Sequence, residues 1–379
     1  MVVRQVREGT FPYQSRPPPW RNWSLSDRAQ THEAGDLLAL LAEATRELTQ
    51  RVPTWGESWP SARKGGRPPI PTAPRVAALL WQSYRGVANR PAAAELRLVA
   101  NSLGLARPFS YGTIAHAYHD PEVLVALRSL LWLTNEPILG KEWGFAVDGS
   151  GFSTTVDTHY GSHRSRQRGA GREEGAFPTV PAPWVRNVAN VGLRFGMVAG
   201  WTSWVDPRLG ELSAFEEVFR STVRLHPEAR IQLGDGLYAA RWVVGRVAEA
   251  GMVGRFLPRR DVTLKCLGEP AWPKSLWGLV KEPQDWLEEY HLRSRVESFW
   301  GALKARNPEK IRKRAPHAWV VEATLRAVVH NLRPLCYWHW VAREEFMPDP
   351  TDSTIAGSES PSIFSKPPGP ERLNSILFD

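Results

Sequence analysis

The sequence predicts an α/β protein in which a helical N-terminal region precedes a region of strands and helices. Apolar residues recur with helical periodicity up to about residue 138, and short apolar runs alternate with amphipathic helices from residue 139 onward. The 379 residues, 42% hydrophobic and 23% charged, can bury a sizeable core in two or three packed units. We therefore divide the chain into an irregular basic and Trp-rich arm, a helical domain, an α/β domain and a flexible Pro/Ser-rich tail, over residues 1–34, 35–138, 139–344 and 345–379.

The helical domain is predicted from segments whose apolar residues share one helix face. They lie at residues 36–52, 75–87, 91–105, 109–120 and 121–133. Ser110 is an N-cap candidate for the fourth segment. A basic linker, SARKGGRPPIPTAP, separates the first two segments. A helix-turn-helix that reads DNA is one use of such a domain, although helices and turns alone do not establish one.

The α/β domain is predicted from apolar runs bounded by turn residues. Strands are expected within WGFAVDGSGFS, NVGLRFGMVAGWTSWV, RIQLGDGLY and MVGRFLPR. Helices are expected at residues 210–226, 239–251, 285–305 and 318–341.

Two aspartates are predicted to end strands of this domain. Asp148 closes an apolar run before a Gly-Ser-Gly loop, and Asp235 closes another before Gly236. Ligands collect at strand ends in α/β sheets, whereas a lone Asp beside glycine is more often a turn or cap residue. The rival aspartates, at positions 157, 206 and 261, follow no equivalent apolar strand.

The segment YHLRSRVESFWGALK, residues 290–304, carries two stripes when it is drawn as a helix. Tyr290, Arg293, Glu297 and Lys304 lie within about 60° of one another, and a second, apolar stripe faces a core. Alone, the polar stripe equally fits a solvated surface helix with an Arg293–Glu297 pair at i,i+4.

Together, the two aspartates and the Tyr-x2-Arg-x3-Glu-x6-Lys spacing resemble an insertion-sequence transposase of the Asp-Asp-Glu (DDE) family. The His-Asn segment AVVHNLRPL, residues 327–335, resembles the helix that closes such cores, and the similarity covers roughly residues 65–340. One departure is that Leu237 and Tyr238 follow Gly236, where the family often has Gly-Tyr two residues after the second Asp.

The resemblance implies an RNase H-like core, in which a mixed sheet is flanked by helices and preceded by a helical DNA-binding domain. It implies cleavage at the ends of an insertion sequence, and joining of those ends to target DNA by two-metal-ion phosphoryl transfer. Asp148, Asp235 and Glu297 would hold two Mg²⁺ ions, with Asp148 bridging them and Mn²⁺ able to substitute. Carboxylate oxygens are the ligands that Mg²⁺ prefers.

The same resemblance implies how the rest of the signature meets DNA. Arg293 and Lys304 would hold phosphates at the transposon end, Arg through its fork and Lys as a point charge. Tyr290 would position the cleaved end by a hydrogen bond or by stacking, without acting as a nucleophile.

The charge of the chain agrees with a polyanionic partner, since the formal net charge is +9. RKGGRPP at 63–69 is similar to a short AT-hook core, and HRSRQRG and KIRKR are candidate phosphate contacts. The residues that we expect to contact DNA in these segments are Arg67, Arg164, Arg166, Arg312 and Lys313. Plain basic linkers and solvated loops are the alternatives.

Other classes of protein are disfavoured. Cys266 and Cys336 are far apart without CxxC spacing, which argues against a zinc finger and a disulfide framework and fits a reducing cytosol. No signal peptide and no bilayer-spanning run is expected, so we predict a cytoplasmic, nucleoid-associated prokaryotic protein without a membrane partner.

The expected partners are the terminal inverted repeats of the transposon, target DNA and a second copy of the chain in a synaptic homodimer. Two further interpretations remain open. One is a catalytically idle, transposase-derived DNA-binding protein, and the other is a metal-dependent DNA nuclease without strand transfer.

Overall fold

A computed structural model describes residues 2–15, 23–55, 70–154, 184–259, 262–307 and 310–341 of the chain. The predicted DNA contacts Arg67, Arg164 and Arg166, the rival positions 157 and 261, and the predicted tail all lie outside these ranges.

The N-terminal part of the structure is helical, as the sequence predicts. Its helices and short 3-10 turns are α1 (Val2–Glu8), α2 (Trp23–Arg51), η1 (Pro53–Trp55), α3 (Thr72–Arg85), α4 (Asn89–Val99), α5 (Tyr111–Ala117), α6 (Pro121–Leu133) and η2 (Glu136–Ile138). Ser110 caps α5, because its side chain accepts a hydrogen bond from the Thr113 N–H at 3.2 Å. Among the described residues, no helix combines the length and apolarity needed to cross a bilayer.

The following part alternates strands and helices. Its elements are β1 (Gly144–Thr154), β2 (Trp184–Gly192), β3 (Val198–Trp204), η3 (Glu211–Ala214), α8 (Phe215–Leu225), β4 (Ile231–Gly234), α9 (Arg241–Glu249), β5 (Val253–Phe256), α10 (Ala271–Lys281), α11 (Pro283–His291), α12 (Ser294–Arg306), β6 (Lys310–Ile311) and α13 (Pro316–Val341). The sequence did not predict α10 or β6.

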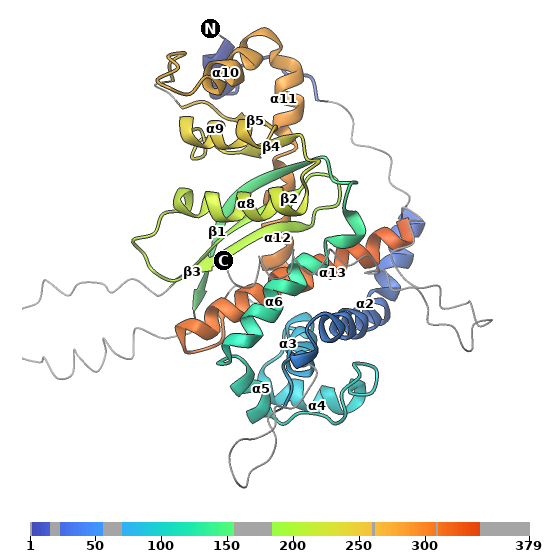
Figure 1. Ribbon diagram of the computed structural model, residues 1–379. Coiled ribbons are helices and arrows are strands. Elements are labelled where there is room, and N and C mark those ends of the chain that lie inside the picture. Colours follow the sequence, from blue (N-terminus) through green and yellow to red (C-terminus); the bar gives the residue numbers. More distant parts are fainter. Residues whose placement is uncertain are drawn as a thin grey trace, which may run out of the picture.

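These strands form one mixed sheet in the order β3-β2-β1-β4-β5, with β6 paired to the far end of β1. β1 runs antiparallel to β2 and parallel to β4, and β4 runs parallel to β5. α8 and α9 cover one face, while α12 and α13 cover the other (Figure 1). The protein is therefore a mixed α/β fold with helices on both faces of the sheet.

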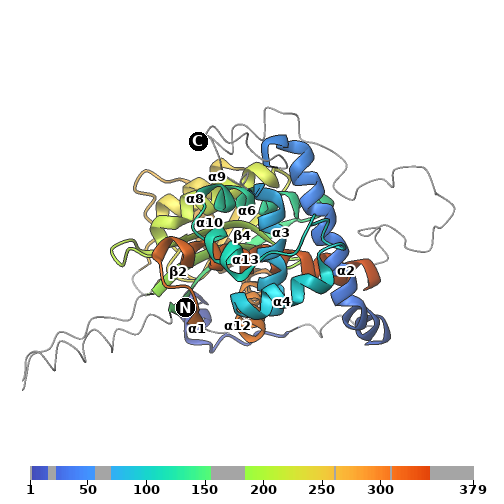
Figure 2. The same ribbon diagram turned by 90° about the horizontal axis from the view of Figure 1, so that it is seen from below.

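The two faces of β1 belong to different hydrophobic cores. Phe145 and Val147 pack with α8 and α9, whereas Ala146 and Phe152 pack in a larger core that includes α12, α13 and the N-terminal helices. Viewed from below, α3, α4 and α13 lie in front of the sheet (Figure 2). α13 therefore joins the N-terminal helices to the sheet within one continuous core.

The predicted irregular arm at 1–34 is wrong for its described residues. α2 begins at Trp23, 13 positions before the predicted Asp36, and packs along α13. Arg333 pairs with Glu33, and the Trp340 ring stacks on His32 with centroids 4.8 Å apart. These contacts come from the far end of the chain, so the local sequence pattern could not reveal them.

The arm also reaches the opposite end of the molecule. Val3 and Val6 of α1 pack against the small core of α10 and α11, which contains Trp286 and Tyr290. The N-terminus therefore lies beside α10 (Figure 1). The described parts of the arm therefore pack against the fold, α1 on α10 and α11, and α2 on α13.

β1 is longer than predicted, because the Gly-Ser-Gly stretch after Asp148 belongs to the strand and does not form a turn. A Cβ on Gly149 would lie 2.2 Å from the Glu211 carboxyl carbon, and one on Gly151 would lie 2.8 Å from the Trp184 ring. The two glycines therefore make room for neighbouring side chains. Close approach of another group is a reason for glycine in a strand that does not involve a turn.

The predicted single helix at 285–305 is also wrong, because it breaks between α11 and α12. The Leu292 and Arg293 N–H groups bond to the carbonyls three residues earlier, at 3.1 and 2.9 Å, and so form a tight 3-10 turn. Tyr290 ends up in the last turn of α11, and Arg293 lies directly before α12.

Candidate active site

The parallel pairing of β1 with β4 sets the centre of the candidate site. Val147 is the last residue of β1 to pair with β4, and its partner is Gly234, the last residue of β4. Asp148 and Asp235 are therefore the next residues on adjacent strands, which lie about 4.8 Å apart. The structure brings these two predicted carboxylates together at one point of the sheet.

A backbone turn holds Asp235. Its Oδ1 accepts the Leu237 N–H at 2.8 Å, and the Arg259 side chain donates to the Gly236 and Leu237 carbonyls at 2.9 Å. The Asp235 side chain thus stabilises the turn that follows it, as expected if Asp235 were only a turn residue. The turn also fixes the direction of the carboxylate, so the structural role and a chemical role are compatible.

Glu211 is a third carboxylate at this point, and the sequence analysis missed it. It lies in η3 against Gly149, and its Oε1 accepts a hydrogen bond from the Tyr238 hydroxyl at 2.7 Å. A glutamate before an amphipathic helix gives no sequence signal of its own. The tight fit over Gly149 is visible only after β1 and η3 are placed together.

Burial and like charges act on Asp148. Burial, followed by the negative charges of Glu211 and Asp235, raises the pKa of Asp148 from the ordinary 3.8 to about 6, against the opposing charge of Arg293. Burial also raises the pKa of Glu211. The cluster therefore concentrates negative charge that the protein alone does not neutralise.

Arg293 interacts with both Asp148 and Glu297. Its guanidinium pairs with Glu297, and the charge of Asp148 acts on it as well. Its Nε is buried and lacks a hydrogen-bond partner among the described residues. Each such buried N–H is costly, so Arg293 has an unused donor at the site.

Glu297 has a different setting from the two aspartates. Its side chain is 53% exposed and pairs with Arg293 at i,i+4, which is the ion pair that the surface-helix interpretation expected. Among the described residues, no three His, Cys, Asp or Glu side chains are grouped closely enough to hold one metal ion. Glu297 is thus linked to Asp148 indirectly, because both carboxylates interact with Arg293.

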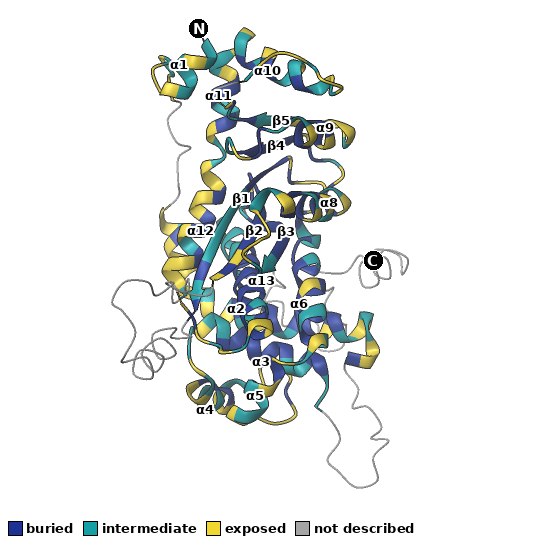
Figure 3. Ribbon diagram, turned by 90° about the vertical axis from the view of Figure 1, so that its left-hand side faces the viewer, coloured by how far each residue is buried: buried dark blue, intermediate teal, exposed yellow. Residues whose placement is uncertain are grey.

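Tyr290 and Lys304 complete the signature in contrasting ways. The Tyr290 ring is buried and stacks on Trp286, with centroids 5.0 Å apart. The Arg293 guanidinium carbon lies 5.8 Å from the centre of this ring, but the ring is packed inside the core of α10 and α11 and not on the surface where the prediction placed it. Lys304 is exposed on α12, where the outer side of the helix is solvated (Figure 3).

The His-Asn segment of α13 has a structural use. Asn331 is fully buried, accepts the Val198 N–H at 2.7 Å and donates to the Val198 carbonyl at 2.8 Å. His330 Nε2 lies 2.9 Å from the Gly196 carbonyl. These contacts fasten the start of β3 to α13, and they lie on the scaffold of the site instead of in its centre.

The remaining described DNA candidates, Arg312 and Lys313, lie together at the junction of β6 with α13, away from the aspartates. Arg312 donates to the Gly86 carbonyl at 3.1 Å, and Lys313 Nζ donates to Asn89 Oδ1 at 2.7 Å. Both side chains therefore face the N-terminal helices. The rival Asp206 is bound by Arg208 in an exposed loop, outside the cluster.

The chain is similar in sequence to a known protein. A protein of Archaeoglobus fulgidus named "Probable transposase for insertion sequence element ISA1214" is 26% identical over 279 residues, which are 72% of this chain and 79% of the relative. No protein-family model matches the chain.

Proposed function

We propose that the protein is a DNA transposase of the Asp-Asp-Glu type, which cuts at the ends of an insertion sequence and joins them to target DNA. The distant relative from Archaeoglobus fulgidus supports a transposase role. The mixed sheet with helices on both faces is compatible with an RNase H-like core. The observation that carries the proposal is the placement of Asp148 beside Asp235 by the pairing of β1 with β4.

The donor set fits Mg²⁺ or Mn²⁺. Asp148 and Asp235 offer carboxylate oxygens at one point, and the charge around Asp148 is not balanced by the protein alone. These two residues would hold the ions, with Glu297 as the third carboxylate after it leaves Arg293. Two bound ions would supply an activated water or 3′-hydroxyl and stabilise the leaving oxygen.

The protein residues around this pair would bind and orient DNA. Arg293, with its buried unpaired Nε, would donate to a phosphate at the cleaved position, since a guanidinium can form two parallel bonds to phosphate oxygens. Lys304, about three turns further along α12, would add a point charge for a phosphate further along the strand. Tyr290 would hold Arg293 in place from inside the core.

Glu211 would act on the site through its charge. It lies against Gly149 and is oriented by Tyr238, so it would strengthen the attraction of the aspartate pair for a cation without reaching the DNA. We therefore assign it a positioning role.

The test is a cleavage and strand-transfer assay on the DNA that flanks the gene, with Mg²⁺ or Mn²⁺. Glu297→Gln should abolish metal-dependent cuts, by about 10³-fold or more, while DNA binding remains. The matched control is Glu289→Gln, since Glu289 is also an exposed partner of an arginine, Arg255 at 2.8 Å. Cuts that survive Glu297→Gln would remove Glu297 from the mechanism.

The same assay separates the alternatives. Tight binding to the element's ends without cuts in the wild type would indicate a catalytically idle DNA-binding protein. Cuts without joining would indicate a nuclease.

A further inference from the structure

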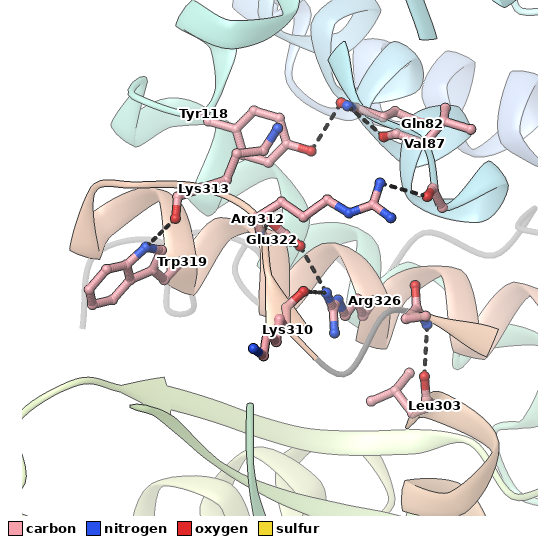
Figure 4. Close-up of polar contacts among 12 residues, drawn as sticks. Gln82, Val87, Tyr118, Leu303, Lys310, Arg312, Lys313, Trp319, Glu322 and Arg326 are labelled. Carbon is pink, nitrogen blue, oxygen red and sulfur yellow. Dashed lines mark hydrogen bonds and ion pairs between the residues drawn. The ribbon is translucent and has the colours of Figure 1, made fainter. Parts of the chain in front are cut away.

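A pocket outside the candidate active site lies between the N-terminal helices and the β6–α13 junction. Its volume is about 540 Å³, which is in the range of small-molecule sites. The α3–α4 connection and α5 form one side, and the segment from β6 into α13 forms the other. Figure 4 shows Arg312 and Lys313 reaching from that segment toward Gln82 and Tyr118.

The lining is strongly cationic. Arg90, Arg312, Lys313 and Arg326 line the pocket, and Glu322 is the single acidic residue among its lining residues. Glu322 is already engaged, because it accepts from the Arg326 side chain at 2.8 Å and from the Arg312 N–H. The other cations therefore present a net positive charge to the pocket.

Lys313 is held in a defined position in this wall. Its Nζ lies 3.7 Å from the centre of the Tyr118 ring and donates to Asn89, while the Tyr118 hydroxyl donates to Gln82 at 3.1 Å. Burial lowers the pKa of Lys313 to about 8, so the ammonium remains mostly charged at pH 7. Arg312 uses the Gly86 carbonyl as an anchor, and a guanidinium has further donors to offer.

An exposed aromatic ring stands at the rim. The Tyr111 side chain is 55% exposed, and the Arg90 guanidinium lies 5.3 Å from its ring centre. Nucleic-acid bases stack on exposed aromatic rings and on Arg planes, and each such stack contributes to affinity without sequence preference. The combination of fixed cations and an open ring matches the phosphate and the base of a nucleotide.

The location permits one DNA molecule to contact both regions. β6 pairs with β1 at Ser153 and Thr154, five and six residues after Asp148, so the start of the pocket wall is roughly 15–20 Å from the aspartate pair. This is less than one turn of duplex, about 34 Å.

We propose that this pocket binds one unstacked nucleotide of a DNA strand, with the phosphate on Arg90, Arg312 and Lys313 and the base against Tyr111. The identification of DNA as the source of the nucleotide rests on the proposed function. A duplex whose bases all stay stacked would contact Arg90, Arg312 and Lys313 through its phosphates, but it would place no base on Tyr111.

The test is fluorescence anisotropy with a labelled single-stranded 20-mer and the matching duplex, in EDTA so that no cleavage occurs. Arg90→Gln and Tyr111→Ala should each weaken binding of the single strand about five- to tenfold, and Tyr111→Ala should leave the duplex within about twofold. Tyr111→Phe, which keeps the ring, should bind the single strand like the wild type. Both positions are exposed, so the variants should fold, and their thermal midpoints verify this.

The matched control is Arg97→Gln, because Arg97 is exposed on the same helix α4 and does not line the pocket. Equal losses for Arg90→Gln and Arg97→Gln would overturn the proposal in favour of a general basic surface. Loss with Arg90→Gln but none with Tyr111→Ala would overturn the proposal in favour of a plain phosphate contact. dTMP and inorganic phosphate are tested as competitors of the labelled single strand. If dTMP binds tightly while the variants keep the DNA affinity of the wild type, the proposal that the pocket binds a nucleotide of DNA is overturned.

The outcome is separable from that of the cleavage assay. Weakened binding in Arg90→Gln with no cuts by the wild type would retain the pocket and reject the transposase activity. Unchanged binding in Arg90→Gln with metal-dependent cuts would do the reverse.

Discussion

Replacing Asp148 by Asn should stabilise the metal-free protein at neutral pH, because the substitution removes a charge that the fold holds unfavourably. The pKa of Asp148 rises from 3.8 to about 6, chiefly through burial and then through Glu211 and Asp235. A shift of about two units corresponds to roughly 3 kcal/mol at full strength. Asp148 is partly exposed, so solvent screening reduces this to about 1–2 kcal/mol.

The pH dependence has a definite sign. In the unfolded chain Asp148 ionises near its ordinary pKa, whereas in the folded protein it keeps its proton up to about pH 6. The folded state therefore binds more protons over this interval, and the free energy of unfolding falls as the pH rises from about 4 to about 7. The advantage of Asp148→Asn should be small at pH 4, grow across this interval and stay constant above it.

Urea unfolding in EDTA at pH 4.5, 6 and 8, followed by tryptophan fluorescence, measures this difference. A matched control is Asp285→Asn, since Asp285 lies in the first turn of α11, away from the aspartate pair. The reasoning is refuted if Asp148→Asn is less stable than the wild type at pH 8, or if its advantage does not change with pH. Adding Mg²⁺ should then stabilise the wild type more than Asp148→Asn, by mass action on the folded state.

Two further predictions concern the surroundings of the aspartates. Asn331→Ala should lower the free energy of unfolding by about 2–3 kcal/mol, because the buried Val198 N–H loses its acceptor, and urea midpoints measure this. Glu211→Gln should raise the Mg²⁺ concentration for half-maximal cleavage about tenfold while leaving the maximal rate within about threefold, because one negative charge beside Asp148 is lost. A loss of maximal rate as large as that of Glu297→Gln would instead make Glu211 a direct ligand.

The apolar runs before Asp148 and Asp235 do form strands, as the sequence predicts, but Asp148 lies within β1 and not at its end. The adjacency of the two aspartates needed the parallel register of β1 and β4, which joins residues more than eighty positions apart. The length of β1 was mispredicted because glycine usually signals a turn, whereas Gly149 and Gly151 are required by the side chains that cover them.

Other features depend on contacts that local patterns do not contain. The polar first half of α2 is helical because α13 packs along it, and α13 lies some 300 residues later. No proline at residues 290–294 indicates the break between α11 and α12, and its tight turn is visible only in the backbone hydrogen bonds. Glu211 could not be found from the sequence, because the contact of its carboxylate with Gly149 depends on how η3 packs on β1.

The two interpretations of the Tyr-Arg-Glu-Lys stripe turn out to describe one arrangement. Arg293 pairs with Glu297 as in a surface helix, yet the charge of Asp148 also acts on it and its Nε is buried without a partner. If Asp148 and Asp235 held a cation, the charge of Asp148 would attract Arg293 less, which would leave the guanidinium available to a phosphate and the Glu297 carboxylate available to the site. On this argument the Arg293–Glu297 pair is a resting arrangement of the proposed site, and it does not count against catalysis.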